Sequence, residues 1–297
     1  MLVIGVFGPT ASGKSDVAAA VTQLIPAEVV SADAMQVYDG LPILTNQSRN
    51  PERLVGLWPL SHVASVGAYA PLAHAAIDEI AAAGKTPLVV GGTGLYFRAA
   101  LAELELPPAP RPGARERWER LYDEAGAVVT HARLAELNAA AAARIHPNDR
   151  RRVVRALELA ETGRSLVPRR EALFGGAWRR PTVLVGLDVP KPELDRRIVE
   201  RTSRMFEGGV EEEVRCALVA GPSETARKVI GLDEIATLPR EEATEAVIVR
   251  TRRYAAYQRK WLRRLEGLVM VAADRPPEET AAEIVALART REHLSRP

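Results

Sequence analysis

Short apolar runs alternate with helical patterns along most of this chain, and the alternation predicts its fold. The apolar runs predict buried strands, and the segments between them place apolar residues at helical spacing. Two such helical patterns are Ser15–Leu24 and Tyr69–Ala83. Strands that alternate with helices predict an α/β fold with a parallel sheet covered by helices on both faces. The predicted strands are Leu2–Phe7, Glu28–Ser31, Pro87–Val90, Thr182–Leu187 and Val269–Ala272.

Residues 105–180 break this alternation, because none of their runs predicts a strand. The stretch opens on a stiff, proline-rich connection, Pro107–Pro112, and continues in helical runs rich in Ala, Arg and Glu. We therefore expect an α/β core made of residues 1–104 and 181–297, interrupted by a helical insertion domain of residues 105–180.

Composition narrows the class of protein. A chain of 297 residues with 47% hydrophobic and 26% charged residues is ordinary for a soluble globular protein of one large or two modest domains. No apolar stretch approaches the length of a membrane span. Cys216 is the single cysteine, which excludes a disulfide framework, and the five histidines lack metal-ligand spacing. These features favour a cytoplasmic enzyme with no membrane partner.

The net charge of +2 hides two basic blocks. Residues 144–180 contain ten arginines and four acidic residues, and residues 250–264 contain seven Arg or Lys and no acidic residue. Basic blocks on an otherwise acidic chain are typical of a protein that binds a polyanion. The alternative is a pair of solvated helix faces in an arginine-rich sequence.

A phosphate-binding loop follows the first predicted strand. Gly8–Ser15 matches G-x-x-x-x-G-K-[ST] and opens a helical pattern, the context that this motif requires. Its backbone N–H groups can converge on phosphate oxygens, Lys14 can reach the terminal phosphate, and Ser15 can hold Mg²⁺. The motif does not say which phosphate compound is bound. The expected phosphate-binding residues are Gly8, Thr10, Ala11, Ser12, Gly13, Lys14 and Ser15.

Two further segments follow predicted strands and should meet the phosphate loop at one edge of the sheet. One is Gly91–Gly94, and the other begins at Asp33. Asp33 alone could be a helix N-cap or the Mg²⁺ ligand of an NTPase. Neither interpretation accounts for Met35, Gln36 and Tyr38, which can pack against and hydrogen-bond a flat base.

In this order, the motifs resemble those of the bacterial tRNA dimethylallyltransferase family, which is also called the tRNA isopentenyltransferase family. The resemblance covers roughly Val3 to Arg264, and the whole set is far more specific than the phosphate loop alone. The motifs that carry it are Gly8–Ser15, Ser31–Tyr38, Gly91–Tyr96, His146–Asp149 with Arg155–Glu158, Arg201 with Met205, Gly209, Glu213 and Val214, and Thr251–Ala255 with Trp261.

The resemblance implies transfer of a prenyl group from dimethylallyl diphosphate to N6 of the adenosine just 3′ of a tRNA anticodon. The family assigns the position of Asp33 as the acceptor of the amine proton. Because diphosphate leaves an allylic carbon, its stabilisation is the main catalytic task. Lys14, Mg²⁺ on Ser15, Thr93 and Arg201 suit that task, so the loop would bind diphosphate without hydrolysing it. The implied catalytic residues are Asp33, Thr93 and Arg201.

The resemblance also gives the basic blocks a partner, the tRNA anticodon stem-loop. In the family, the insertion and a C-terminal helical region grip this RNA, whose loop bases are already single-stranded and cost less to extrude. We expect a monomer. The implied tRNA-binding residues are Asp33, Ala34, Met35, Gln36, Arg151, Arg152 and Arg155.

Several positions depart from the family pattern, and most fall in segments that support the active-site rim or face the RNA. The donor side is intact, so the departures concern tRNA selection and catalytic strength more than the class of reaction. The departures include Asp39 for Arg, Gln47 for Lys, Leu232 and Asp233 for Tyr and Lys, and Ala256 and Tyr257 for Lys and Arg.

Three alternatives stay open. A cytokinin-type transferase would prenylate free AMP, although a mononucleotide needs few cations. A small-molecule kinase would use the insertion as a lid, although the Asp33–Tyr38 segment and Thr93 argue against it. A non-catalytic RNA-binding relative is the third, and the intact phosphate loop, Asp33 and Arg201 argue against it.

Overall fold

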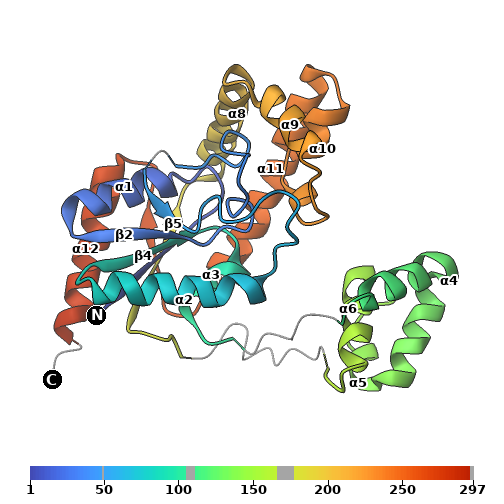
Figure 1. Cartoon of the computed structure of the whole chain (residues 1–297). Coiled ribbons are helices and arrows are strands. Elements are labelled where there is room, and N and C mark those ends of the chain that lie inside the picture. Colours follow the sequence, from blue (N-terminus) through green and yellow to red (C-terminus); the bar gives the residue numbers. More distant parts are fainter. Residues whose placement is uncertain (49, 105–110, 166–176, 295–297) are drawn as a thin grey trace. The chain divides into compact units, whose positions relative to one another are not determined.

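The computed structural model describes residues 1–48, 50–104, 111–165 and 177–294. The chain divides into two compact units, one formed by residues 1–103 with 174–297 and the other by residues 104–173 (Figure 1). Most of the proline-rich connection at Pro107–Pro112 lies outside the described residues, as do Arg169, Arg170 and Glu171 of the first basic block.

The first unit is built on a six-stranded sheet in which every pair of neighbouring strands is parallel. The strand order is β3-β2-β4-β1-β5-β6. β1 is buried along its whole length and β4 at every residue after Thr86, which explains their continuous apolar runs. The strands are β1 (Val3–Phe7), β2 (Ala27–Ser31), β3 (Glu52–Arg53), β4 (Thr86–Gly91), β5 (Thr182–Asp188) and β6 (Leu268–Ala272).

Helices cover both faces of this sheet (Figure 1). On one face, α1 (Lys14–Leu24), α8 (Lys191–Glu207) and α12 (Pro277–Leu294) bury residues such as Val21 and Ile284 against β1, β4 and β5. On the other face, α2 (Val66–Ala82) and α3 (Gly94–Leu101) contribute Tyr69 and Phe97 to a second apolar cluster. The α/β fold predicted from the alternating pattern is therefore confirmed.

The chain from residue 210 to 262 adds α9 (Val210–Val219), the 3₁₀ helix η1 (Ala226–Lys228), α10 (Leu232–Thr237) and α11 (Arg240–Leu262). α11 packs against α8. Its buried positions Val247, Thr251, Ala255 and Gln258 recur every three or four residues, so one stripe of the helix faces the core. That stripe brings the polar residues Thr251 and Gln258 into the interior.

The second unit contains α4 (Ala114–Leu137), α5 (Ala139–Ala142) and α6 (Arg150–Ala160). α4 bends at Gly126, whose φ of 83° is left-handed. Trp118, Leu134 and Leu157 lie in its apolar core. No strand occurs among the described residues of this unit.

The structure differs from the sequence expectation in detail. β3 has only two residues, too few for a sequence pattern to reveal. α2 begins at Val66, where Ser65 caps the helix by accepting a hydrogen bond from the Ala68 N–H. The expected insertion ended at residue 180, but Trp178 already pairs with Ala102 of the first unit. Among the described residues, no helix is long and apolar enough to cross a membrane.

Candidate active site

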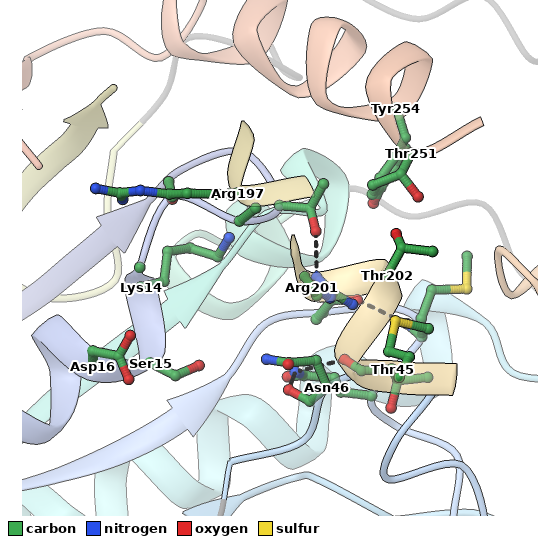
Figure 2. Close-up of a pocket in the computed structure, with 18 of the residues that line it drawn as sticks. Lys14, Ser15, Asp16, Thr45, Asn46, Arg197, Arg201, Thr202, Thr251 and Tyr254 are labelled. Carbon is green, nitrogen blue, oxygen red and sulfur yellow. Dashed lines mark hydrogen bonds between the residues drawn. The ribbon is translucent and has the colours of Figure 1, made fainter. Parts of the chain in front are cut away.

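A cavity of about 490 Å³ lies in the first unit, beyond the carboxyl ends of β1 and β2. This is where open parallel sheets bind their ligands. Its lining includes the phosphate loop, the segment after β2, α8 and α11 (Figure 2). Its polar lining includes Thr10, Ser12, Lys14, Ser15, Asp33, Gln36, Arg197, Arg201, Thr251 and Tyr254.

The phosphate loop has the backbone that the motif requires. Gly13 has a φ of 84°, a left-handed conformation that glycine adopts without strain, and α1 begins at the next residue. The Lys14 ammonium donates to the carbonyl oxygens of Gly8 (3.0 Å) and Pro9 (2.7 Å). Burial lowers the pKa of Lys14 to about 8, against the opposing effect of Asp33 and together with the nearby Arg201.

α8 presents a row of guanidinium groups to the phosphate loop. Arg201 donates to the Thr10 hydroxyl at 2.6 Å. Burial lowers the pKa of Arg201, while Asp33 acts to raise it. Arg197, one turn earlier, lies 3.8 Å from where a Cβ on Gly13 would be, so its guanidinium covers the loop (Figure 2).

Arg197 escaped the sequence analysis, although its spacing of four residues from Arg201 places the two on one helix face. Glu193 accepts a hydrogen bond from the Arg197 Nε at 2.6 Å. The Ala273 carbonyl accepts another from Arg197 Nη1 at 3.1 Å. These contacts hold Arg197 over the phosphate loop.

Asp33 also lines the cavity. One of its carboxylate oxygens accepts a hydrogen bond from the Met35 N–H at 2.9 Å, so the side chain closes a turn and does not cap a helix. The charge of Asp33 acts on the pKa of Lys14, of Arg201 and of Tyr254. A carboxylate is therefore within electrostatic reach of the cations that surround the phosphate loop.

Hydrogen bonds fix the segment that carries Asp33. The Gln36 amide accepts from the Ser31 hydroxyl at 2.9 Å and donates to the carbonyl oxygens of Thr45 and Asn46. Glu213 accepts from the backbone N–H groups of Ile43 and Leu44, each at 2.7 Å. The rim of the cavity is thus held by side chains from two distant parts of the chain.

Tyr38 does not reach the cavity, so the expectation that it packs against a base is wrong. Its side chain is 1% exposed, and its hydroxyl donates to the Thr225 hydroxyl at 2.6 Å. Gln47, which stands where the family has Lys, donates to the Tyr38 carbonyl at 2.9 Å. Both residues stabilise the segment that carries Asp33 without lining the cavity.

α11 joins the phosphate loop to the Gly91–Gly94 loop. Gln258 accepts from the Thr10 N–H at 2.7 Å and donates to the Gly92 carbonyl at 3.0 Å. The Thr93 hydroxyl is 3.2 Å from the Tyr254 hydroxyl and accepts from the Ala34 N–H at 3.1 Å. The sequence analysis found neither Tyr254 nor Gln258 as a site residue.

The residues predicted from the sequence fall into three groups. Thr10, Ala11, Ser12, Gly13, Lys14, Ser15, Asp33, Met35, Gln36 and Arg201 line the cavity. Gly8, Ala34 and Thr93 stand directly behind this lining, where they bond to Lys14 or to one another. The third group, Arg151, Arg152 and Arg155, lies on α6 of the second unit.

The three arginines of α6 differ in environment. Arg155 is paired with the fully buried Glu158 at 2.7 Å. Arg152 lies 3.5 Å from Asp149, and its side chain is 68% exposed. Arg151 is exposed. Arg150 is held by Asp123 and Glu119, so much of this basic block is engaged in ion pairs within the unit.

Oxygen ligands suited to Mg²⁺ line the cavity. They include the Ser15 hydroxyl and the carboxylates of Asp16 and Glu52. Burial raises the pKa of Glu52, with a smaller opposing effect of a hydrogen bond to Ser48. No group of three His, Cys, Asp or Glu that could hold a metal occurs among the described residues. An ion here would therefore share its coordination with phosphate oxygens and water.

The fold and this cavity define a phosphate-loop α/β protein in which one cavity is lined by a carboxylate and by several cationic side chains. The model of the IPP transferase family matches residues 36–265. The tRNA dimethylallyltransferase of Thermobifida fusca is 42% identical over 281 residues, which cover 88% of this chain and 87% of that protein. The corresponding enzyme of Anaeromyxobacter dehalogenans is 41% identical, over 96% of this chain and 99% of that protein.

Two solved structures are similar over nearly the whole chain. The tRNA isopentenylpyrophosphate transferase of Bacillus halodurans has a TM-score of 0.69 and 28% identity, over 98% of each chain. A eukaryotic dimethylallyltransferase acting on tRNA has a TM-score of 0.78 and 25% identity, over 100% of this chain and 80% of that one. The chain belongs to the IPP transferase family.

Proposed function

We propose that this protein transfers a dimethylallyl group from dimethylallyl diphosphate to N6 of the adenosine 3′ of the anticodon in tRNA, and releases diphosphate. The observation that carries this proposal is that one cavity is lined both by the cations Lys14, Arg197 and Arg201 and by the Asp33 carboxylate. Relatives at about 40% identity are tRNA dimethylallyltransferases, which supports the same substrates here.

The cations account for the departure of diphosphate. As the bond between the allylic carbon and the diphosphate oxygen breaks, the electron pair leaves with the oxygen and negative charge grows there. Hydrogen bonds already hold Lys14 and Arg201 at the phosphate loop, so little reorganisation would be needed with diphosphate bound there. In the same step, N6 of the adenine forms a bond to the allylic carbon.

Asp33 accounts for the proton. The exocyclic amine of adenine is a weak nucleophile because its lone pair is delocalised into the ring. When N6 bonds to carbon it becomes acidic, and a carboxylate in hydrogen-bond reach can take the proton. The turn that holds Asp33 through the Met35 N–H leaves its second carboxylate oxygen for this role.

The residues at the phosphate loop fit Mg²⁺ as a cofactor. Ser15 would be its protein ligand, and the ion would neutralise charge on the diphosphate. Cytoplasmic location and a monomeric state stay predictions from the sequence.

The second unit would hold the anticodon stem-loop through α6. Replacement of Arg151 and Arg152 by Ala should weaken tRNA binding and reduce the slope of log K against log salt by about 1.5 to 2, because two phosphate contacts are lost. Filter binding over a salt series measures this slope. Arg289→Ala, on the exposed face of α12, is the charge control and should leave it unchanged. If the double variant has the same slope as the wild-type protein, α6 is not part of the RNA interface.

Arg155 should behave differently from its neighbours. Without Arg155, the buried carboxylate of Glu158 loses one of its ion-pair partners and keeps the ion pair with Arg115. Arg155→Ala should therefore lower the melting temperature more than Arg151→Ala does.

Lys14 predicts a pH dependence of diphosphate binding. In the free protein its pKa is about 8, so the ammonium is charged below pH 8 and progressively lost above it. The last ionisation of dimethylallyl diphosphate is near pH 6, so the charge of the ligand does not change above pH 8. The Kd for this ligand should therefore rise by up to about tenfold per pH unit above pH 8, as Lys14 loses its proton. Calorimetric titration checks this. Lys14→Arg, which stays charged, should flatten the profile, and a flat wild-type profile would contradict the lowered pKa.

Transfer of label from radiolabelled dimethylallyl diphosphate with Mg²⁺ tests the proposed function. Unmodified tRNA and free AMP are offered in parallel. Label on tRNA alone supports the proposal, whereas label on AMP alone indicates a cytokinin-type enzyme. Label on neither, together with ATP turnover, would indicate a kinase.

A further inference from the structure

The Gln258 side chain on α11 connects two loops at the carboxyl edge of the sheet. Its Oε1 accepts a hydrogen bond from the Thr10 N–H at 2.7 Å, and its Nε2 donates to the Gly92 carbonyl at 3.0 Å. The residue is 1% exposed and does not line the cavity. The proposed catalytic steps give Gln258 no role, although it contacts the phosphate loop directly.

Glutamine suits this position because its two partners differ in kind. A backbone N–H only donates and a carbonyl only accepts, and the planar amide of glutamine carries both an acceptor and a donor. A carboxylate could not donate to Gly92, and an ammonium or guanidinium could not accept from Thr10. The fit is close, since a Cβ on Gly92 would lie 2.3 Å from the Gln258 Nε2. Gln258 therefore fixes the Thr10 backbone against the loop that follows β4.

Thr10 connects this contact to α8. Its backbone N–H is held by Gln258, and its hydroxyl accepts a hydrogen bond from Arg201 Nη1 at 2.6 Å. The contacts thus run from α11 through Thr10 to a guanidinium that lines the cavity. A shift of the Thr10 backbone would therefore move the hydroxyl that holds Arg201.

Arg201 depends on such a support for its orientation. An arginine side chain has many rotamers and loses conformational entropy when it is held in one of them. Stabilisation of a departing diphosphate requires the guanidinium to be oriented before the reaction, and a displacement of about 1 Å can lower a rate by about a hundredfold. The Thr10 hydroxyl favours one orientation, and Gln258 determines where that hydroxyl lies.

We propose that Gln258 is a positioning residue, which orients Arg201 through Thr10 for the departure of diphosphate. This inference rests on the proposed transfer from dimethylallyl diphosphate. It gives Gln258 an effect on kcat and on the binding of diphosphate, although Gln258 contacts neither substrate. Binding of the RNA does not depend on this residue.

A double-mutant cycle tests the inference with anticodon stem-loop RNA and dimethylallyl diphosphate. Gln258→Met keeps the length of the side chain and removes both polar ends, so it should lower kcat about tenfold, with KM for RNA within about twofold. Thr10→Val removes the hydroxyl and keeps the backbone N–H. In that background, Gln258→Met should change kcat by less than about twofold, because its effect passes through the hydroxyl. In Thr10→Ser, which keeps the hydroxyl, the full effect of Gln258→Met should return.

A general loss of stability is controlled by Ile284→Val. Ile284 is buried on α12 and does not line the cavity, so this variant should lower the melting temperature and keep kcat within about twofold of wild type. If the effects of Gln258→Met and Thr10→Val on kcat multiply, the inference is overturned, because Gln258 would then act by a route that does not include the Thr10 hydroxyl.

Binding of inorganic diphosphate separates this inference from the proposed function, since it requires no transfer. In calorimetric titration with Mg²⁺, Gln258→Met should raise the Kd for diphosphate about tenfold, and it should have no further effect in the Thr10→Val background. An unchanged Kd in Gln258→Met would overturn the inference. A wild-type protein that binds diphosphate but transfers no dimethylallyl group to RNA would instead overturn the proposed function.

Discussion

Asp33→Asn is expected to lower kcat for transfer to tRNA by about 10²–10⁴-fold, the range that a positioned general base contributes. The amide cannot take the proton from N6. Its oxygen can still accept the hydrogen bond from the Met35 N–H, so the turn should persist and RNA binding should change less than about twofold. Single-turnover kinetics with prebound tRNA measures the chemical step without product release.

Asp39→Asn is the matched control for Asp33→Asn. Asp39 lies six residues later in an exposed turn, where it accepts from the Gly40 N–H, and it does not line the cavity. This variant should keep near wild-type turnover. If Asp33→Asn also kept near wild-type turnover, Asp33 would not be the base.

Arg201→Ala is expected to lower kcat by about 10²–10³-fold, as does the loss of one preorganised group that stabilises developing negative charge. Arg201 is held by the Thr10 hydroxyl within the loop that would bind the diphosphate. Its removal also relieves the effect that lowers the pKa of Lys14, so that pKa should rise. Steady-state kinetics at several pH values separates the two consequences.

Arg215→Ala controls for the loss of one positive charge, because Arg215 is 69% exposed on α9 and pairs only with nearby Glu212 among the described residues. Its kcat should stay within about twofold of wild type. Retained transfer in Arg201→Ala would assign stabilisation of the leaving group to the phosphate loop alone.

The sequence was sufficient for the features that are local in the chain. The apolar run of β1, the phosphate loop and the start of α1 are contiguous, so the motif predicted all three together. Asp33 was found because it follows β2 directly, and parallel strands end at a common edge.

Features that depend on contacts between distant residues could not be predicted. Gln258 lies 248 residues from the Thr10 that it holds, and helical periodicity marks it only as one position of a long helix. Tyr38 follows Asp33 closely, but its ring turns into the core to meet Thr225, which no local pattern reveals. Gly94 is required because a Cβ there would lie 2.0 Å from Trp261, again a contact with α11.

The six departures from the family pattern named above do not line the cavity. Asp39 and Gln47 lie in the supporting loop, and Leu232 is buried where α10 begins. Ala256 and Tyr257 are on the exposed side of α11, whereas Tyr254 and Gln258 face inward. These six departures therefore leave the cavity lining unchanged. This supports an unchanged reaction and leaves tRNA selection as the property that these departures would tune.

The central claim is that one cavity joins a dimethylallyl group to an adenosine of tRNA through Asp33. The most direct test is mass spectrometry of nucleosides and nuclease fragments, after unmodified tRNA is incubated with dimethylallyl diphosphate, Mg²⁺ and either wild-type or Asp33→Asn protein. The account predicts one adenosine, just 3′ of the anticodon, that carries one dimethylallyl group on N6 with the wild type and none within the same time with the variant. A dimethylallyl group at another position, or equal modification by both proteins, would contradict it.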